Sequence, residues 1–351
     1  MKIISTLIFG MGLLFVINSS YGSNIEVEAN NRDFIAAEII EESTKWGVSY
    51  PGKAINTNRS GAVELIYIVN TSGKPTEIVI GAYTNKMFIK PAIKAIKKYR
   101  YTPALLNGEP VQSVESKVLN FSGRYLNSKV VDKFDENYEL FKQEFSKPEP
   151  DLTLLQKHLK RMAGMRQANP TAQAILNHAE MAYAEKYLPL EKKIEATKVV
   201  DIFGLGRLGA TRKRLVKQRL VSLYFEAGRY GDAVKVINSL QLYKLRSSRE
   251  SKKSIFVETL DQIDEIKNSE KSFYNAIEIN DRGYVLRNLL KNRFTVDQVV
   301  GQIDELVFRC ETKFYRMRFD LNKDYQVPAS WGSCNLQILG EGGTKGLLLE
   351  G

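Results

Sequence analysis

Apolar and polar residues alternate along residues 61–69, and this alternation predicts a β-strand. Val63, Leu65, Tyr67 and Val69 occupy every second position, so their side chains share one face of the strand. The opposite face becomes apolar in its second half, which indicates that another part of the protein covers it in part.

Two turns place further strands after the first one. Ser72-Gly73 supplies a glycine that accepts a positive φ, and it leads into a second predicted strand at residues 77–81. Asn107-Gly108 sets another tight turn, before a last predicted strand that ends at Phe121. The segment therefore predicts a small sheet.

A basic amphipathic helix is predicted between the second and last strands, over residues 86–98. Its apolar stripe, at helical spacing, consists of Ile89, Ile93 and Ile96. Lysines lie largely off this stripe, toward water: Lys90, Lys94, Lys97 and Lys98. Pro91 fits only in the first helical turn, where a missing N–H costs little.

Three short motifs identify this segment. They are Tyr50-Pro51, the string Tyr99-Arg100-Tyr101-Thr102-Pro103-Ala104, and Asn107-Gly108-Glu109-Pro110-Val111. At these spacings, with Gly61, Gly73, Ala92 and Val118, residues 48–122 resemble the C-terminal domain of the TonB family of periplasmic energy transducers, and the domain is expected over residues 48–124. The likeness covers about a fifth of the chain.

The resemblance implies a two-layer α/β fold that binds a peptide. Family members add a short extended segment of an outer-membrane transporter as a strand to the edge of the sheet. Carried over to this chain, the edge is the last strand: Ser113, Val114, Glu115, Ser116, Lys117, Val118, Leu119 and Asn120. The alternative is that Glu115 and Lys117 blunt this edge, as charged side chains often do.

The N-terminus predicts export. Lys2 precedes an apolar run of 15 residues and a small-residue site near Gly22, which is typical of a cleaved signal peptide over residues 1–22. A retained membrane anchor is the alternative, although the run is shorter than a bilayer span. Residues 23–47 form a leader in which Phe34, Ile35, Ile39 and Ile40 have the spacing of a short helix. The long proline-rich spacer of family transducers is not expected here.

Residues 132–268 have apolar periodicity near 3.6 and predict a helical region. Residues 151–167 and 171–188 predict two antiparallel helices. Residues 222–233 resemble the centre of a tetratricopeptide repeat, with a glycine turn between helices and Tyr230 and Ala233 packed inward. Because such repeats need stacked neighbours, an array of two to three hairpins is expected, either for protein docking or as a structural spacer.

The letters of residues 204–209 match the dinucleotide fingerprint GxGxxG. No βαβ pattern surrounds them, and no acidic residue ends a following strand at the required distance. The match therefore predicts a glycine-rich loop between helices, and no nucleotide or other cofactor is expected.

Residues 270–340 predict a small α+β domain, followed by a flexible, glycine-rich tail at residues 341–351. Its expected elements are strands at 274–279, 310–319 and 334–339 and a helix at 295–306. Cys310 and Cys334 are the two cysteines of the chain and predict one disulfide in an oxidising compartment. His158 and His178, the two histidines, lie far from them in helical sequence, so no metal site is expected.

Composition narrows the class of partner. The formal net charge of +11 could attract nucleic acid, but an exported protein seldom meets any. Anionic lipid headgroups, lipopolysaccharide or peptidoglycan-associated polymers fit better, and scattered solvated lysines are the plainer explanation.

The sequence thus predicts an α+β protein in the periplasm: a non-enzymatic adaptor for envelope proteins, among them the periplasmic segment of an outer-membrane transporter. A homodimer through the same edge is a further option. The first alternative is an inner-membrane-anchored transducer of siderophore or vitamin uptake. The second is an envelope hydrolase using Asp281 or Glu305, which no paired carboxylate or nucleophile supports.

Overall fold

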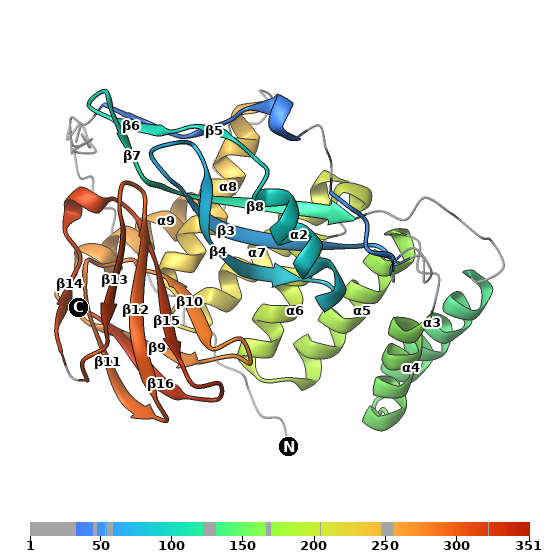
Figure 1. The fold of residues 1–351 in the computed structure, drawn as a ribbon. Helices are drawn as coiled ribbons and strands as arrows, with labels where there is room; N and C mark the ends of the chain where they lie inside the picture. Colours follow the sequence, from blue (N-terminus) through green and yellow to red (C-terminus); the bar gives the residue numbers. More distant parts are fainter. Residues whose placement is uncertain are drawn as a thin grey trace, which may run out of the picture.

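The computed structural model describes residues 33–44, 48–52, 54, 59–121, 131–165, 170–203, 205–246, 256–321 and 323–351. Helices and strands are mixed within them, so the predicted α+β class is confirmed. We refer to the N-terminal module (residues 34–121), the helical region (131–268) and the C-terminal sandwich (273–350), which Figure 1 shows as three packed parts. In the described part of the chain, no helix combines the length and apolarity needed to cross a membrane. The predicted signal peptide lies outside the described residues.

The N-terminal module is built on a three-stranded antiparallel sheet. Its strands are β3 (Gly61–Val69), β4 (Pro75–Tyr83) and β8 (Ser113–Phe121), in the order β4-β3-β8. A short 3-10 turn, η2 (Lys86–Phe88), leads into α2 (Ile89–Ile96), which covers one face of the sheet (Figure 1). The predicted helix is therefore present, with Pro91 in its first turn.

Alternation along β3 produces the core between the sheet and α2. Val63, Leu65 and Tyr67 are buried against Phe88 and Ile96. Five such large side chains each contribute roughly 1.5–3 kcal/mol when fully buried, so this layer is the main stabilising element of the module.

The leader does not form the expected short helix through Phe34–Ile40. Instead its backbone is extended and pairs with the segment that carries the RYTPA string. The pairs join β1 (Phe34–Ile35) to β6 (Ala104–Leu106) and β2 (Glu38–Ile39) to β5 (Tyr101–Thr102), with η1 (Glu41–Thr44) after them and β7 (Glu109–Val111) beyond β6. Long-range backbone pairing thus overrides the local helical spacing.

The region predicted as helical consists, in its described residues, of helices joined by short loops. Its helices are α3 (Val131–Phe145), α4 (Leu152–Gly164), α5 (Pro170–Tyr187), α6 (Leu190–Ile202), α7 (Leu205–Glu226), α8 (Tyr230–Arg246) and α9 (Phe256–Asn268). Each helix packs against the next, and the α3–α4 pair projects from the body of the molecule (Figure 1). The tetratricopeptide-like character of the region stays a prediction.

The turn between α7 and α8 has the predicted form. Gly228 adopts φ +67, and a Cβ there would lie 2.3 Å from the carbonyl oxygen of Tyr274. Ala233 is fully buried, and Tyr230 packs edge-on against Phe225 and Phe273. By contrast, the loop expected at residues 204–209 is wrong, because α7 already begins at Leu205. Residue 204 lies outside the described residues.

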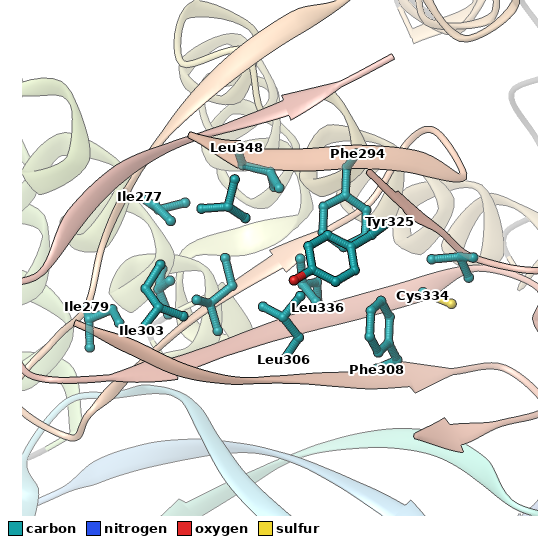
Figure 2. Close-up of a cluster of buried hydrophobic side chains, with 14 of the residues drawn as sticks. Ile277, Ile279, Phe294, Ile303, Leu306, Phe308, Tyr325, Cys334, Leu336 and Leu348 are labelled. Carbon is teal, nitrogen blue, oxygen red and sulfur yellow. The ribbon is translucent and has the colours of Figure 1, made fainter. Parts of the chain in front are cut away.

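The C-terminal part is a sandwich of two four-stranded sheets. The first has the order β10 (Tyr284–Asn288), β15 (Cys334–Gly340), β12 (Ile303–Cys310), β13 (Phe314–Arg318); the second has β14 (Tyr325–Gln326), β11 (Arg293–Val300), β16 (Lys345–Glu350), β9 (Phe273–Glu278). Figure 2 shows Phe294 and Leu348 from one sheet facing Leu306, Phe308 and Leu336 from the other.

Three predictions for this part are corrected. The helix expected at residues 295–306 is the β11–β12 hairpin, because a bulge between Asp297 and Val300 breaks the strand alternation and imitates helical spacing. The tail expected to be flexible contains β16, which is hydrogen-bonded to β11 on one side and β9 on the other. Within the described residues this part holds the short 3-10 turn η4 (Ala329–Trp331) and no α-helix, so its predicted α+β character is also wrong.

The predicted disulfide is present between Cys310 and Cys334, which lie directly opposite each other on β12 and β15. We expect Cys310→Ala with Cys334→Ala to lower the free energy of unfolding of the sandwich by about 3 kcal/mol, because the reduced unfolded chain regains the entropy of an open loop. Urea denaturation of the variant beside the oxidised protein measures this loss. A difference below about 0.5 kcal/mol would show that strand pairing alone fixes these two positions.

The sandwich packs on the face of the N-terminal sheet that α2 leaves open. The contact is apolar. From the sheet it involves Ile66, Val79 and Val114, and from the sandwich Tyr284 and Leu339. The apolar second face predicted for β3 is therefore covered by a segment more than 200 residues later, as the separation of Ile80 and Tyr284 illustrates.

Candidate functional site: the β8 edge

Strand β8 lies at one edge of the N-terminal sheet. Its nine residues pair in continuous antiparallel register with β3, from Gly61 opposite Phe121 to Val69 opposite Ser113. Among the described strands, β3 is the one partner of β8. One side of β8 is thus fully used and the other faces away from the sheet.

The direction of each backbone group of β8 follows from the hydrogen bonds of β3. Ala62 uses both its N–H and its C=O toward Thr84, on the β4 side. Because successive residues of a strand direct these groups to opposite sides, Val63 and every second residue after it face β8. Their partners are Ser113, Glu115, Lys117, Leu119 and Phe121.

The intervening residues of β8 therefore present their backbone to the free edge. They are Val114, Ser116, Val118 and Asn120. In the described structure no hydrogen bond reaches the N–H or C=O of any of the four. Ser116 and Asn120 are also exposed to solvent. The edge thus offers four outward donor–acceptor pairs in register, the arrangement that a guest strand requires.

The opposite edge of the same sheet, on β4, is occupied by later segments of the chain. The Tyr284 hydroxyl donates to the carbonyl oxygen of Ile80 at 3.0 Å and accepts from its N–H at 3.1 Å. Arg309 donates to the carbonyl oxygen of Glu77 at 2.5 Å, and the Lys198 ammonium lies 3.4 Å from that of Gly81. The sandwich and α6 thus cap β4. On β8 the sandwich contacts the face that carries Val114, and the outward backbone groups have no described hydrogen-bond partner.

The eight residues predicted for the site divide between the two faces of the sheet. Ser113 and Leu119 are buried on the face covered by α2, and Glu115 and Lys117 share this face with them. Val114 packs on the opposite face, where the sandwich lies. Glu115 and Lys117 were expected as possible edge-blunting charges, but their backbone groups face β3, so they do not block the outward positions.

Two tyrosines, Tyr67 and Tyr101, lie near the side chain of Glu115. Tyr67 is its direct neighbour on β3, and the Tyr67 and Tyr101 hydroxyls are hydrogen-bonded to each other. Removal from water raises the pKa of Glu115 to about 7, and burial likewise raises the pKa of Tyr67 and of Tyr99. A carboxyl group that exchanges its proton near neutral pH thus lies in the strand that forms the open edge.

We expect Glu115→Gln to raise the free energy of unfolding by about 1–3 kcal/mol at pH 8 and to leave it nearly unchanged at pH 4. The pKa of Glu115 in the folded protein is raised from 4.5 to about 7, so the free energy of unfolding falls as pH rises from 4.5 through 7. Glutamine mimics the protonated form and removes the loss. The measurement is urea denaturation at both pH values, with the exposed Glu109→Gln as control; equal effects of the two variants would contradict the burial of Glu115.

The sequence singled out β8 as the candidate edge, and it did not predict the cap on the β4 edge. Tyr284, Arg309 and Lys198 lie in segments that carry no pairing signal toward β4, so their role could not be read from local patterns. The histidines are separate from this site: His158 lies 3.4 Å from Asn137 in the helical region. Among the described residues, no group of three or more His, Cys, Asp or Glu side chains is placed to hold a metal ion.

Residues 47–122 match the family model described as Gram-negative bacterial TonB protein C-terminal. The matched residues include β3, β4, α2 and β8, and so contain both edges of the N-terminal sheet. No curated protein matches the chain.

Proposed function

We propose that this protein is a non-enzymatic adaptor of the Gram-negative envelope that binds an extended protein segment along β8. The observation that carries the proposal is the set of outward backbone groups at Val114, Ser116, Val118 and Asn120. The match of residues 47–122 to the TonB C-terminal family supports the same mode, since that resemblance implies strand addition by a transporter segment.

The capped β4 edge supports the choice of β8. A sheet with two open edges would pair with unrelated strands, and proteins commonly cover or charge such edges. Strand β13 of the sandwich also has one neighbour among the described strands, but it has five residues and carries Arg316 and Arg318. Short, charged strands are poor templates for a guest strand, so β8, with nine residues, is favoured over β13.

A photo-crosslinking residue at position 116 tests the proposal in cells. We expect it to capture an envelope protein through an extended segment, because Ser116 is exposed and its backbone faces outward. The same residue at the exposed position 239, on α8, is the control. Identical captured proteins at both positions would contradict a site on β8. The segment identified at position 116 is referred to below as the crosslinked segment.

Whether residues 1–22 are cleaved decides between the two forms of this function. If the signal peptide is cleaved, the protein is a free periplasmic adaptor; if the N-terminus is retained, it is an inner-membrane-anchored transducer of the TonB type. Mass spectrometry of the purified protein distinguishes them, since an intact Met1 favours the anchored form. The docking role of the helical region belongs to the same proposal, as a second surface for a protein partner.

A second copy of the chain could occupy the β8 edge in place of a partner. Light scattering behind size-exclusion chromatography separates these cases. A dimer that dissociates when the crosslinked segment is added would show that both compete for β8. A dimer that survives saturation with this segment would place the interface between copies elsewhere.

A further inference from the structure

A cluster of cations without acidic partners covers α2 and the residues that flank it. Its members are Lys74, Lys86, Lys90, Lys94, Lys97, Lys98 and Arg100, all exposed. Within the described part of the chain, none of them lies in an ion pair. Helix α2 itself carries no acidic residue, so the positive charge of this face is uncompensated along its length.

A pocket of about 510 Å³ opens beside this cluster, between α2 and the first residues of β4. Pro75, Ile78 and Ile93 provide its apolar surface, and Lys74, Lys97 and Arg100 provide its cations. The volume is within the range of small-ligand sites, roughly 300–1,000 Å³. The lining thus combines an apolar part with three cations.

Arg100 is held in place for binding. Its Nη1 atom donates to the carbonyl oxygens of Lys97 at 3.1 Å and Tyr99 at 2.7 Å, while its backbone N–H donates to Ser43. No described partner uses its Nε or Nη2, so these donors remain for a ligand. A guanidinium that is already fixed loses little conformational entropy when it forms a bidentate pair with a phosphate.

One carboxylate, that of Glu77, also lines the pocket, and it shares the guanidinium of Arg316 with Glu305. Glu77 forms an ion pair with Arg316 at 3.2 Å, and its carbonyl oxygen accepts from Arg309. The pocket therefore keeps a net positive charge that favours an anion.

An extended peptide cannot pair with the backbone next to this pocket. Glu77, Ile80 and Gly81 already use outward backbone groups toward the sandwich and α6. The remaining cations, moreover, follow α2 across the surface and do not line β4. These features disfavour a peptide strand and favour a ligand that belongs to an extended anionic surface.

We propose that the pocket between α2 and β4 binds the phosphate-bearing headgroup of an anionic lipid, while the lysines of α2 contact neighbouring headgroups of the same membrane. Lys97 and Arg100 hold the phosphate, and the carbons next to it lie against Ile78 and Ile93. Since β3 separates β4 from β8, a protein bound in this way keeps its β8 edge free. The proposal does not depend on what β8 binds.

Sedimentation of the full chain with vesicles tests it. We expect binding to vesicles of phosphatidylglycerol with phosphatidylcholine and none to phosphatidylcholine alone. Lys97→Gln with Arg100→Gln should weaken binding about thirty-fold, the loss expected for two cations beside an anionic surface. Lys313→Gln with Arg318→Gln removes the same charge from the exposed sandwich surface and should weaken it less than threefold.

Further measurements distinguish a lipid headgroup from free phosphate and from an acidic protein. Equal losses in both double variants would overturn the pocket, because any cation would then suffice. Inorganic phosphate, at a concentration equal to that of the lipid phosphate, should not displace the protein from the vesicles. Displacement would show that the pocket binds the free anion and would overturn the proposal of a lipid headgroup. Binding of poly-glutamate without vesicle binding would assign the surface to acidic proteins. Lys74→Gln with Lys97→Gln repeats the test if the first variant melts at a lower temperature.

Discussion

Proline at positions 116 and 118 is expected to weaken binding of the crosslinked segment at least tenfold without unfolding the protein. The N–H groups of Ser116 and Val118 face the open edge, so proline removes two donors to the guest and none to β3. Two lost backbone hydrogen bonds, together with the bulk of two pyrrolidine rings at the edge, should lower affinity by at least tenfold. Calorimetric titration with a peptide of the crosslinked segment measures the change.

Ser116→Ala with Val118→Ala is the matched control for this prediction. It keeps both N–H groups and removes the same side chains, so affinity should stay within about threefold of the parent protein. Circular dichroism and thermal melting check that the proline variant is folded. Equal losses in the two variants would show that side chains, and not the backbone of β8, hold the guest.

Loss of the Asp232 carboxylate is expected to cost about 3–5 kcal/mol of stability, because it leaves the buried Arg229 with the partly exposed Glu191 as its remaining described counter-charge. Arg229 Nη2 lies 2.6 Å from Asp232, and both side chains are almost fully buried. Asp232 also accepts from the backbone and side chain of Asn288, at 3.3 and 2.5 Å, which ties α8 to β10. Removal of this group therefore weakens the junction of the helical region and the sandwich.

Urea denaturation of Asp232→Ala measures the cost, and Glu195→Ala is the control. Glu195 forms an exposed ion pair with Lys192 at 2.8 Å, so its loss should change stability by less than about 1 kcal/mol. Burial alone would raise the pKa of Asp232, but Arg229 and Arg287 hold it below its ordinary value of 3.8. The contribution of Asp232 to stability is therefore present above pH 3.8 and is lost as pH falls through the lowered pKa. Similar costs for the two variants would contradict a buried junction.

The sequence predicted the N-terminal module well because its signals are local. The alternation of Val63, Leu65 and Tyr67 and the turn glycine Gly73 suffice to place the strands. The same reasoning failed for the leader and for β16, since the pairing partners of Phe34 and Leu348 lie far away in the chain. A residue's local spacing cannot show which distant backbone will pair with it.

The C-terminal sandwich shows how one irregularity hides a strand. Gln298 adopts φ 49 at the bulge in β11, so the apolar residues on either side of it fall at helical instead of alternating intervals. The candidate site divides in the same way: the outward positions of β8 follow from its register, whereas the Tyr284 cap on β4 depends on a contact across 204 positions of sequence.

Amide hydrogen exchange of β8 in the presence of the crosslinked segment is the most direct test of the open-edge mechanism. Strand addition at β8 should slow exchange at Val114, Ser116, Val118 and Asn120 when this segment is bound. Exchange at the alternate residues, which are already paired with β3, should change little. Protection that appears elsewhere on the protein, with these four amides still exchanging freely, would contradict strand addition at β8.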